Sequence, residues 1–121
     1  ALPFLPEGGT IVTTSSVQAY YPGEILIDYA STKCAIIGFT RALAKQVASK
    51  GIRVNCVAPG VIETDMMASF TAEDKAALAE ETPVERLGTP EEVARTLVFL
   101  AGRGAGFITG QVLGVNGGIV I

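Results

Sequence analysis

Two short runs rich in β-branched residues flank one long helix-forming stretch, and this order constrains the fold more than any other feature of the chain. The first run, "GGTIVTTSS", predicts a strand over 10–14, and the second, "IRVNCVAPG", ends at Pro59 and Gly60. Ala, Leu, Lys, Arg and Gln dominate residues 27–50, and Gly51 supplies the stop. Neither run alternates cleanly, so both are expected to be buried on both faces. The order predicts a parallel βαβ unit with a right-handed crossover.

The rest of the chain extends this pattern. The stretches "TAEDKAALAEE" and "TPEEVARTLVFLAG" predict two helices, with Thr71 and Thr89 as N-caps and Asp74 placed to complete a capping box. A third strand is expected in "GQVLGVNGG", while "VIETDMMASF" is irregular or weakly helical. Three strands alternating with helices predict an α/β fold with a parallel sheet. Because three strands make a narrow sheet, we expect the chain to be the C-terminal part of a longer α/β protein.

Composition excludes several classes of function. The 121 residues are 49% hydrophobic and carry a net charge of −3, so no nucleic-acid partner is expected. Cys34 and Cys56 lack CxxC spacing and the chain has no histidine, which predicts two buried free thiols and no metal site. No apolar run is long enough to span a membrane, and the start "ALPFLPEGG" lacks the basic region of a signal peptide. These features favour a cytoplasmic protein.

Charge is unevenly distributed along the sequence. Five of the nine basic residues lie between 33 and 53, and seven of the twelve acidic residues lie between 71 and 92. The simplest interpretation is two solvated helix faces of opposite sign.

The stretch "YASTK" places Tyr29 and Lys33 at i and i+4 of the long predicted helix, and therefore on one face. A free phenol is a poor base at neutral pH, and a nearby ammonium favours its ionised form. Such a pair suits the exchange of a proton with an alcohol or a ketone. On spacing alone, two polar residues on a solvated helix face are the simpler explanation.

Other segments converge on the same place. Ser15 and Ser16 follow the first strand, and Pro59-Gly60 end the next, so both pairs lie at the carboxyl edge of the predicted sheet. Ligands of open α/β sheets bind at this edge. The segment "VIET" continues from there and brings the hydroxyl of Thr64 to the same cleft. A serine that merely caps the turn after the strand is the structural alternative for Ser16.

Taken together, these motifs resemble the short-chain dehydrogenase/reductase family over essentially the whole chain. The matching stretches are "TTSSV", "YASTK", "RVNCVAPGVIETDM", "RLGTPEEVA" and "ITGQVLGVNGG". Within the family, "APGVIETDM" and "ERLGTPEEVA" are similar to 3-oxoacyl-[acyl-carrier-protein] reductases. The resemblance implies that residues 1–121 are the C-terminal catalytic portion of one Rossmann-like, doubly wound parallel sheet with flanking helices. The dinucleotide-binding half would precede Ala1.

The resemblance also implies an activity, the interconversion of a ketone and a secondary alcohol with NAD or NADP. Tyr29 would be the general acid that protonates the carbonyl oxygen as hydride arrives. Lys33 would favour the tyrosinate and bond the nicotinamide ribose, so that both residues contact the cofactor. Ser16 would orient and polarise the substrate carbonyl.

Further cofactor contacts follow from the resemblance alone. Pro59, Gly60 and Ile62 would lie against the nicotinamide end, and Thr64 would bond its carboxamide or a phosphate. Asn55 matches a structural position of the family and is not expected to be catalytic. The glycine-rich phosphate loop, the selector of NAD or NADP and the catalytic asparagine have no counterpart in this sequence. The glycines of "GRGAGFITG" lie between a helix and a strand, and predict a helix stop and a turn.

The substrate is left open by the sequence. An acyl thioester on an acidic carrier would need basic docking residues, for which Lys50 qualifies but Glu7 has the wrong sign. A small ketone, a sugar or a polyol is the alternative, and so is a family member that has lost catalysis. Family members usually form tetramers or dimers through the long helix and the last strand. The small residues Ala30, Cys34 and Gly38 and the tail "GGIVI" fit such contacts, or an ordinary core.

Overall fold

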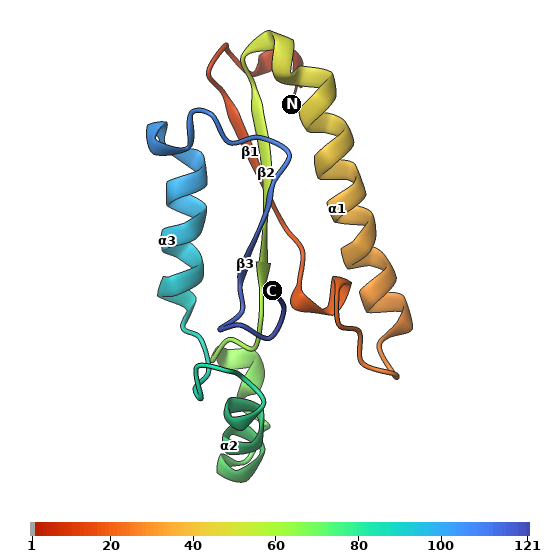
Figure 1. The fold of residues 1–121 in the computed structure, drawn as a ribbon, viewed down its shortest axis with the longest axis vertical. Helices are drawn as coiled ribbons and strands as arrows, with labels where there is room; N and C mark the ends of the chain where they lie inside the picture. Colours follow the sequence, from red (N-terminus) through yellow and green to blue (C-terminus); the bar gives the residue numbers. More distant parts are fainter. Residues whose placement is uncertain (1) are drawn as a thin grey trace.

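The fold is a three-stranded parallel sheet with helices on both faces. A computed structural model describes residues 2–121. Strands β1 (Thr10–Thr14), β2 (Arg53–Pro59) and β3 (Val112–Val115) lie side by side in that order (Figure 1). The helices are α1 (Ile27–Val47), α2 (Ala72–Glu80) and α3 (Pro90–Ala101). The predicted order of elements is confirmed, and the three strands point their carboxyl ends toward the same edge.

Consecutive residues of the strands face different helices. Ile11 and Val54, which are opposite each other in the sheet, pack with Leu43 and Val47 of α1. Val12 packs instead with Leu100 of α3 on the other face. Because β2 lies between two strands and two helices, its residues from Val54 to Ala58 are all buried. The doubly wound architecture expected from the resemblance is therefore confirmed.

The two crossovers have opposite hands. The connections through α1 and α3 both advance by one strand in the same direction across the sheet, yet α1 and α3 cover opposite faces (Figure 1). With β1–α1–β2 in the right-handed form that parallel units nearly always take, β2–α3–β3 is left-handed. The chain reaches the second face by way of the long segment 60–89, which passes around the carboxyl edge of the sheet.

Two expectations about burial were wrong. β1 is only partly buried, and Thr14 at its end is exposed, because β1 pairs on one side only among the described residues. Cys34 is exposed on α1, whereas Cys56 in the central strand is buried as expected. The Cys34 thiol donates to the backbone oxygen of Ala19 at 3.2 Å, a contact that does not cover the side chain.

Local signals for helix ends were accurate. Thr71 and Thr89 each cap a helix within a complete capping box, closed by Asp74 and Glu92 respectively. The long helix ends at Val47 rather than residue 50, since its last turn tightens into a 3-10 helix before Gly51, which has a φ of 68°. Within residues 2–121, the structure contains no helix both long and apolar enough to cross a membrane.

The helix α2 stands apart from the sheet. It lies beyond the carboxyl ends of the strands (Figure 1), and none of its residues is buried. The segment that carries α2 is tied at its root, where Ile62 and Gly88 form an isolated parallel bridge. Glu63 donates its backbone N–H to Gly88 at 2.9 Å, and Gly88 donates to Val61 at 3.0 Å. The segment therefore leaves and returns to the domain at one point next to the predicted site.

Candidate active site

The end of β1 is joined directly to the helix that carries Tyr29 and Lys33. Ser15 extends the pairing of β1 by donating its backbone N–H to Val57 at 2.8 Å. Its buried hydroxyl donates to the backbone oxygen of Lys33 at 2.8 Å. Ser15 therefore fixes the position of α1 along the strand direction, relative to the carboxyl edge of the sheet. It thereby also fixes where Lys33 lies relative to that edge.

Tyr29 and Lys33 are neighbours in space as well as in sequence. The Lys33 ammonium lies 5.3 Å from the centroid of the Tyr29 ring, and donates to the backbone oxygen of Thr14 at 3.4 Å. The ring of Tyr29 is 42% exposed, and its hydroxyl has no hydrogen-bond partner within residues 2–121. Such an arrangement leaves the phenol free to bond a ligand and places a positive charge beside it.

Ser16 is buried just after the end of β1, and its side chain has a structural partner. The hydroxyl accepts a hydrogen bond from the backbone N–H of Gln18 at 3.2 Å and thereby caps the short 3-10 helix Val17–Ala19. Within the described chain, no hydrogen bond joins Ser16 to Tyr29. The capping alternative is thus realised, while the hydroxyl proton itself remains available for a further acceptor.

A second segment reaches the same edge from β2. The strand ends at Pro59, and Gly60 donates its backbone N–H to Val115 at 2.9 Å. Ile62 then makes the bridge to Gly88, and Thr64 begins the 3-10 helix Asp65–Met67. The exposed Thr64 hydroxyl has no hydrogen-bond partner within residues 2–121. The carboxyl edge thus brings both predicted groups of residues to neighbouring strand ends.

These residues fit the nicotinamide end of a dinucleotide. The hydroxyls of Tyr29 and Thr64 are unpartnered in the described chain, and the Lys33 ammonium uses only one of its three N–H groups. The hydroxyls of a ribose, or the amide of a carboxamide, can form hydrogen bonds with these side-chain donors and acceptors. The described residues hold no comparable cradle for the pyrophosphate, since Gly102 and Gly106 belong to the cap and turn that follow α3.

Asn55 has a structural place in the sheet. It is fully buried in β2, where its amide nitrogen donates to the backbone oxygen of Ile108 at 2.8 Å. Its amide oxygen accepts from the backbone N–H of Gln111 at 3.1 Å. Both ends of the side chain are therefore engaged in fixing the loop before β3. The expectation of a structural role agrees with this geometry.

A contact at the site was missed from the sequence. Gly60 lies directly against Asn116 at the end of β3, and a Cβ at Gly60 would come within 2.8 Å of the Asn116 Cα. From the sequence, "VNGG" is expected only as the end of the third strand. An asparagine followed by two glycines is a turn signal that would have drawn attention to it.

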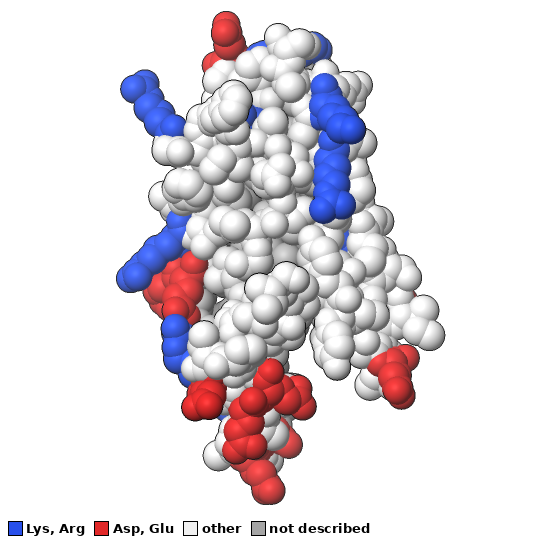
Figure 2. Space-filling model, in the orientation of Figure 1, with Lys and Arg blue, Asp and Glu red and all other residues white. Residues whose placement is uncertain are grey.

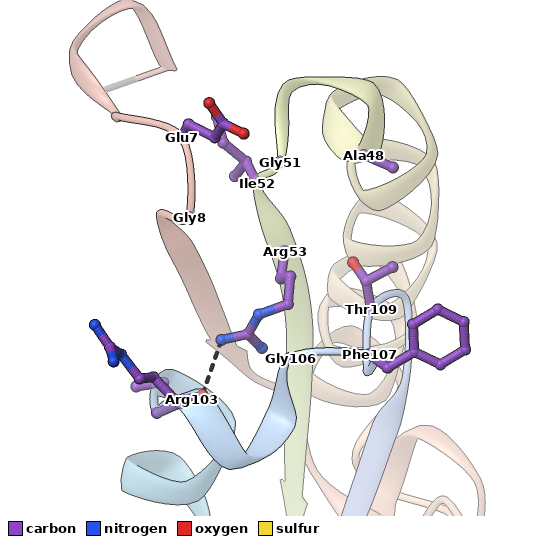
Figure 3. A pocket seen from close by; sticks show the side chains of 12 residues that line it. Glu7, Gly8, Ala48, Gly51, Ile52, Arg53, Arg103, Gly106, Phe107 and Thr109 are labelled. Carbon is purple, nitrogen blue, oxygen red and sulfur yellow. Dashed lines mark hydrogen bonds between the residues drawn. The ribbon is translucent and has the colours of Figure 1, made fainter.

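A large cavity lies elsewhere. It has a volume of about 720 Å³ and opens at the amino ends of the strands, between Gly8, Gly51 and the turn after α3 (Figure 3). Arg53 is engaged there, donating to the backbone oxygens of Leu100 and Gly102 at 2.9 and 3.1 Å. The side chains of Arg103 and Phe107 point away from each other (Figure 3).

Lys50 and Glu7 also lie at this amino edge. Gly51, next to Lys50, packs against Glu7: a Cβ there would be 2.8 Å from the Glu7 Cγ. At 1.5 Å per residue, α1 separates them from Tyr29 by about 30 Å. The expected position of these residues at the mouth of the site is wrong for a single chain, because the mouth is at the other end of α1.

The carboxyl edge carries the negative charge of the molecule. The segment 63–85 contains seven acidic residues and a single lysine. Figure 2 shows these acidic side chains gathered over α2 at the lower end, with Lys and Arg mostly at higher levels. One carboxylate is neutralised locally, since Lys75 bonds Glu63 at 3.0 Å. The surroundings of the candidate site are therefore acidic.

Comparison with known proteins gives one consistent picture. A family profile described as "Enoyl-(Acyl carrier protein) reductase" matches residues 1–120. A glucose and ribitol dehydrogenase homolog of Oryza sativa subsp. japonica is 49% identical over 94% of this chain. A 3-oxoacyl-[acyl-carrier-protein] reductase of Chlamydia trachomatis is 46% identical over 93% of it. The chain spans only 38% of the length of the first protein and 46% of the second.

Solved structures agree with the fold at high similarity. A short-chain dehydrogenase/reductase of Brucella melitensis, described as a glucose/ribitol dehydrogenase, superposes with a TM-score of 0.93 and 41% identity. A blue fluorescent protein from a metagenomic library, in complex with NADPH, gives 0.92 at 33% identity. Each match covers the whole of this chain and 49% of the other. On its profile match, its sequence relatives and its fold, the chain belongs to the short-chain dehydrogenase/reductase family.

Proposed function

We propose that this chain is the catalytic C-terminal portion of an NAD- or NADP-dependent oxidoreductase that interconverts a ketone and a secondary alcohol. The observation that carries the proposal is the Lys33 ammonium 5.3 Å from the ring of Tyr29, with the phenol exposed at the carboxyl edge of the sheet. Membership of the family supports the same activity. In this proposal residues 1–121 form the C-terminal part of a single Rossmann-type domain.

Each residue of the site has a distinct task in the proposed reduction. When bound, the reduced nicotinamide supplies a hydride, that is, two electrons and a proton nucleus, to the carbonyl carbon. Tyr29 gives its hydroxyl proton to the carbonyl oxygen and is left as a phenolate. Lys33 stabilises that phenolate by its charge. Because Tyr29 is 42% exposed, the phenolate regains a proton from water. Ser16 donates its hydroxyl proton in a hydrogen bond that orients the carbonyl.

The cofactor contacts proposed for Pro59, Gly60, Ile62 and Thr64 rest on their position. They follow the carboxyl end of β2, beside the strand end that leads to Ser16. Thr64 has an unpartnered hydroxyl for a hydrogen bond to the cofactor. The backbone at Pro59-Gly60 supplies the surface against which the nicotinamide ring packs in this proposal. A solved relative is in complex with NADPH, which supports a dinucleotide as the cofactor.

A sugar, a polyol or another small carbonyl compound is the proposed substrate class. The acidic segment 63–85 borders the site and would repel an acidic carrier protein. A carrier held at Lys50 would have to present its acyl group about 30 Å away, at the other end of α1. Two relatives described as glucose and ribitol dehydrogenases support the same choice. A 3-oxoacyl thioester remains the second candidate, because a relative described as a 3-oxoacyl-[acyl-carrier-protein] reductase is 46% identical.

The test is a nicotinamide-consumption assay of the full-length protein. Glucose, ribitol, simple ketones and 3-oxoacyl thioesters are offered in turn with both dinucleotides, and absorbance at the nicotinamide band is followed. Turnover of a polyol or a ketone supports the proposal, and preferential turnover of the thioesters would replace the substrate class. Absence of turnover with every substrate, together with no binding of either dinucleotide, would favour a non-catalytic member of the family.

A further inference from the structure

The last strand ends in a turn that a single side chain holds together. The amide oxygen of Asn116 accepts from the backbone N–H of Gly118 at 2.9 Å, and its amide nitrogen donates to the backbone oxygen of Val120 at 3.1 Å. Gly117 and Gly118 have φ values of 62° and 93°, a region that side chains disfavour. The stretch "NGG" therefore specifies a tight turn that closes around the Asn116 amide.

One side of this turn lies against the proposed nicotinamide segment. A Cβ at Gly60 would come within 2.8 Å of the Cα and 3.0 Å of the Cβ of Asn116. The backbone N–H of Gly60 also donates to Val115, the residue before Asn116, at 2.9 Å. Gly60 is therefore required by the close approach of Asn116, quite apart from any ligand. A shift of Asn116 would move the backbone at Pro59-Gly60 with it.

The other side of the turn holds the returning end of the α2 segment. Val84 donates its backbone N–H to the oxygen of Gly117 at 3.2 Å. A Cβ at Gly117 would come within 2.5 Å of the Thr82 methyl group, and one at Gly118 within 3.2 Å of Pro83. Thr82 is buried, and its hydroxyl donates to the backbone oxygen of Leu78 in α2 at 3.1 Å. The turn is therefore linked to α2 through a single residue, Thr82.

We propose that Asn116 is a positioning residue that sets two parts of the site at once. The Asn116 amide holds the turn in place. The turn positions Gly60, whose backbone is part of the proposed nicotinamide site. The same turn also positions residues 82–84 at the root of the α2 segment. A pocket of about 260 Å³ between these parts is lined by Ile62, Thr82 and Asn116 among others. The catalytic part of this inference rests on the proposed function, whereas the positioning part rests on contacts alone.

The first measurement is hydrogen exchange of the full-length protein without ligand. In Asn116→Ala, amide exchange at Gly60, Thr82 and Val84, whose N–H groups are hydrogen-bonded, should accelerate by about tenfold, whereas exchange in β1 and the body of α1 stays unchanged, because only the turn loses its two bonds. Asn116→Asp keeps the acceptor for Gly118 but sets a carboxylate oxygen, in place of the donor, against the backbone oxygen of Val120, so it should accelerate exchange by less than Asn116→Ala does. Gln111→Ala, an exposed amide just before β3, is the control and should change neither segment.

The second measurement separates positioning from general damage. Asn116→Ala should raise the dissociation constant of the dinucleotide and the KM of the substrate by about tenfold, with kcat at saturation within about threefold of wild type. Asn116→Asp should restore most of the affinity. If Asn116→Ala does not fold, the Asn116→Asp exchange pattern decides alone.

Unchanged exchange in both segments would overturn the inference, and so would acceleration spread evenly over the chain. Accelerated exchange in Asn116→Ala, together with a wild-type protein that neither binds a dinucleotide nor turns over a substrate, would leave Asn116 with its structural role alone. That result would remove the proposed function and, with it, the catalytic part of the inference.

Discussion

At the scale of residues, the site depends on a phenol and an ammonium held by one helix and one strand end. Ser15 bonds the backbone of Lys33, and the Lys33 side chain reaches back to Thr14. Two bonds between the same elements leave little freedom for the pair. The Tyr29 hydroxyl, the proposed proton donor, remains without a hydrogen-bond partner in the described chain, which agrees with a group reserved for substrate.

We expect Tyr29→Phe to reduce turnover by roughly 10²–10⁴-fold, because the proton donor is removed while the ring is kept. The dissociation constant of the dinucleotide should change by less than about threefold. Steady-state kinetics and fluorescence titration of the full-length protein check both. Tyr21→Phe, which alters an exposed tyrosine in the loop before α1, is the matched control. Wild-type turnover in Tyr29→Phe would remove the role proposed for Tyr29.

Lys33→Met should weaken turnover and dinucleotide affinity together, each by on the order of tenfold or more, since one charge serves both the phenolate and the ribose. Lys45→Met removes a lysine from the far part of the same helix and should change neither. A loss of turnover with unaltered affinity would confine Lys33 to the tyrosine, and a loss of affinity alone would confine it to the cofactor. Either result would contradict the shared role.

At the scale of elements, the start of α3 carries the strongest electrostatic feature of the chain. Glu92 accepts hydrogen bonds from the Arg86 guanidinium at 2.6 and 3.0 Å and from the backbone N–H of Thr89 at 2.9 Å. These bonds, the Arg86 bond foremost, lower the pKa of Glu92 from 4.5 to about 2. Arg86 lies just before the bridge at Gly88, so this pair fastens the root of the α2 segment to α3.

The lowered pKa of Glu92 predicts a particular dependence on pH. A depressed folded-state pKa stabilises the native protein above the unfolded value, near pH 4.5, and the contribution fades as pH falls toward about 2. The difference in Tm between wild type and Glu92→Gln should therefore be constant near neutrality and shrink below pH 4.5. Glu91→Gln, one residue away and exposed, should show a small difference throughout. A Glu92 difference that stays constant down to pH 2.5 would contradict the ion pair.

At the scale of the whole molecule, apolar surface is left open on α1. Phe39 is 57% exposed, and a Cβ added at Gly38 would meet nothing within 4 Å in the described chain. A glycine inside a helix costs about 1 kcal/mol relative to alanine, so an open surrounding does not explain it. We propose, as the resemblance implies, that another helix approaches this face in a dimer or tetramer.

Gly38→Leu tests this face. In the full-length protein it should convert the assembly into smaller species in light scattering, because a leucine would separate two closely packed helices. Ala76→Leu on the exposed face of α2 should leave the mass unchanged. If Gly38→Leu kept the wild-type mass and raised Tm, the face would be solvent-exposed and the glycine without a role in assembly.

Much of this protein was determined by local sequence. The strands, the helix caps at Thr71 and Thr89 and the left-handed stop at Gly51 follow from hydrophobic runs, hydroxyl groups and a missing Cβ, which act within a few residues. The convergence of Ser16, Tyr29 and Pro59 on one edge follows from parallel strands, whose carboxyl ends must coincide. These features could be predicted because each depends on neighbours in the chain or on one simple rule of topology.

Tertiary structure alone decided the rest. The sequence did not show that α3 covers the second face through a left-handed crossover, that Lys50 and Glu7 lie about 30 Å from the tyrosine, or that Cys34 is exposed. Nor did it show that Asn116 presses on Gly60 and, through Gly117, on residues 82–84. Such contacts join residues tens of positions apart. Their distances are set by how sheet, helices and loops pack together, and no local propensity encodes that packing.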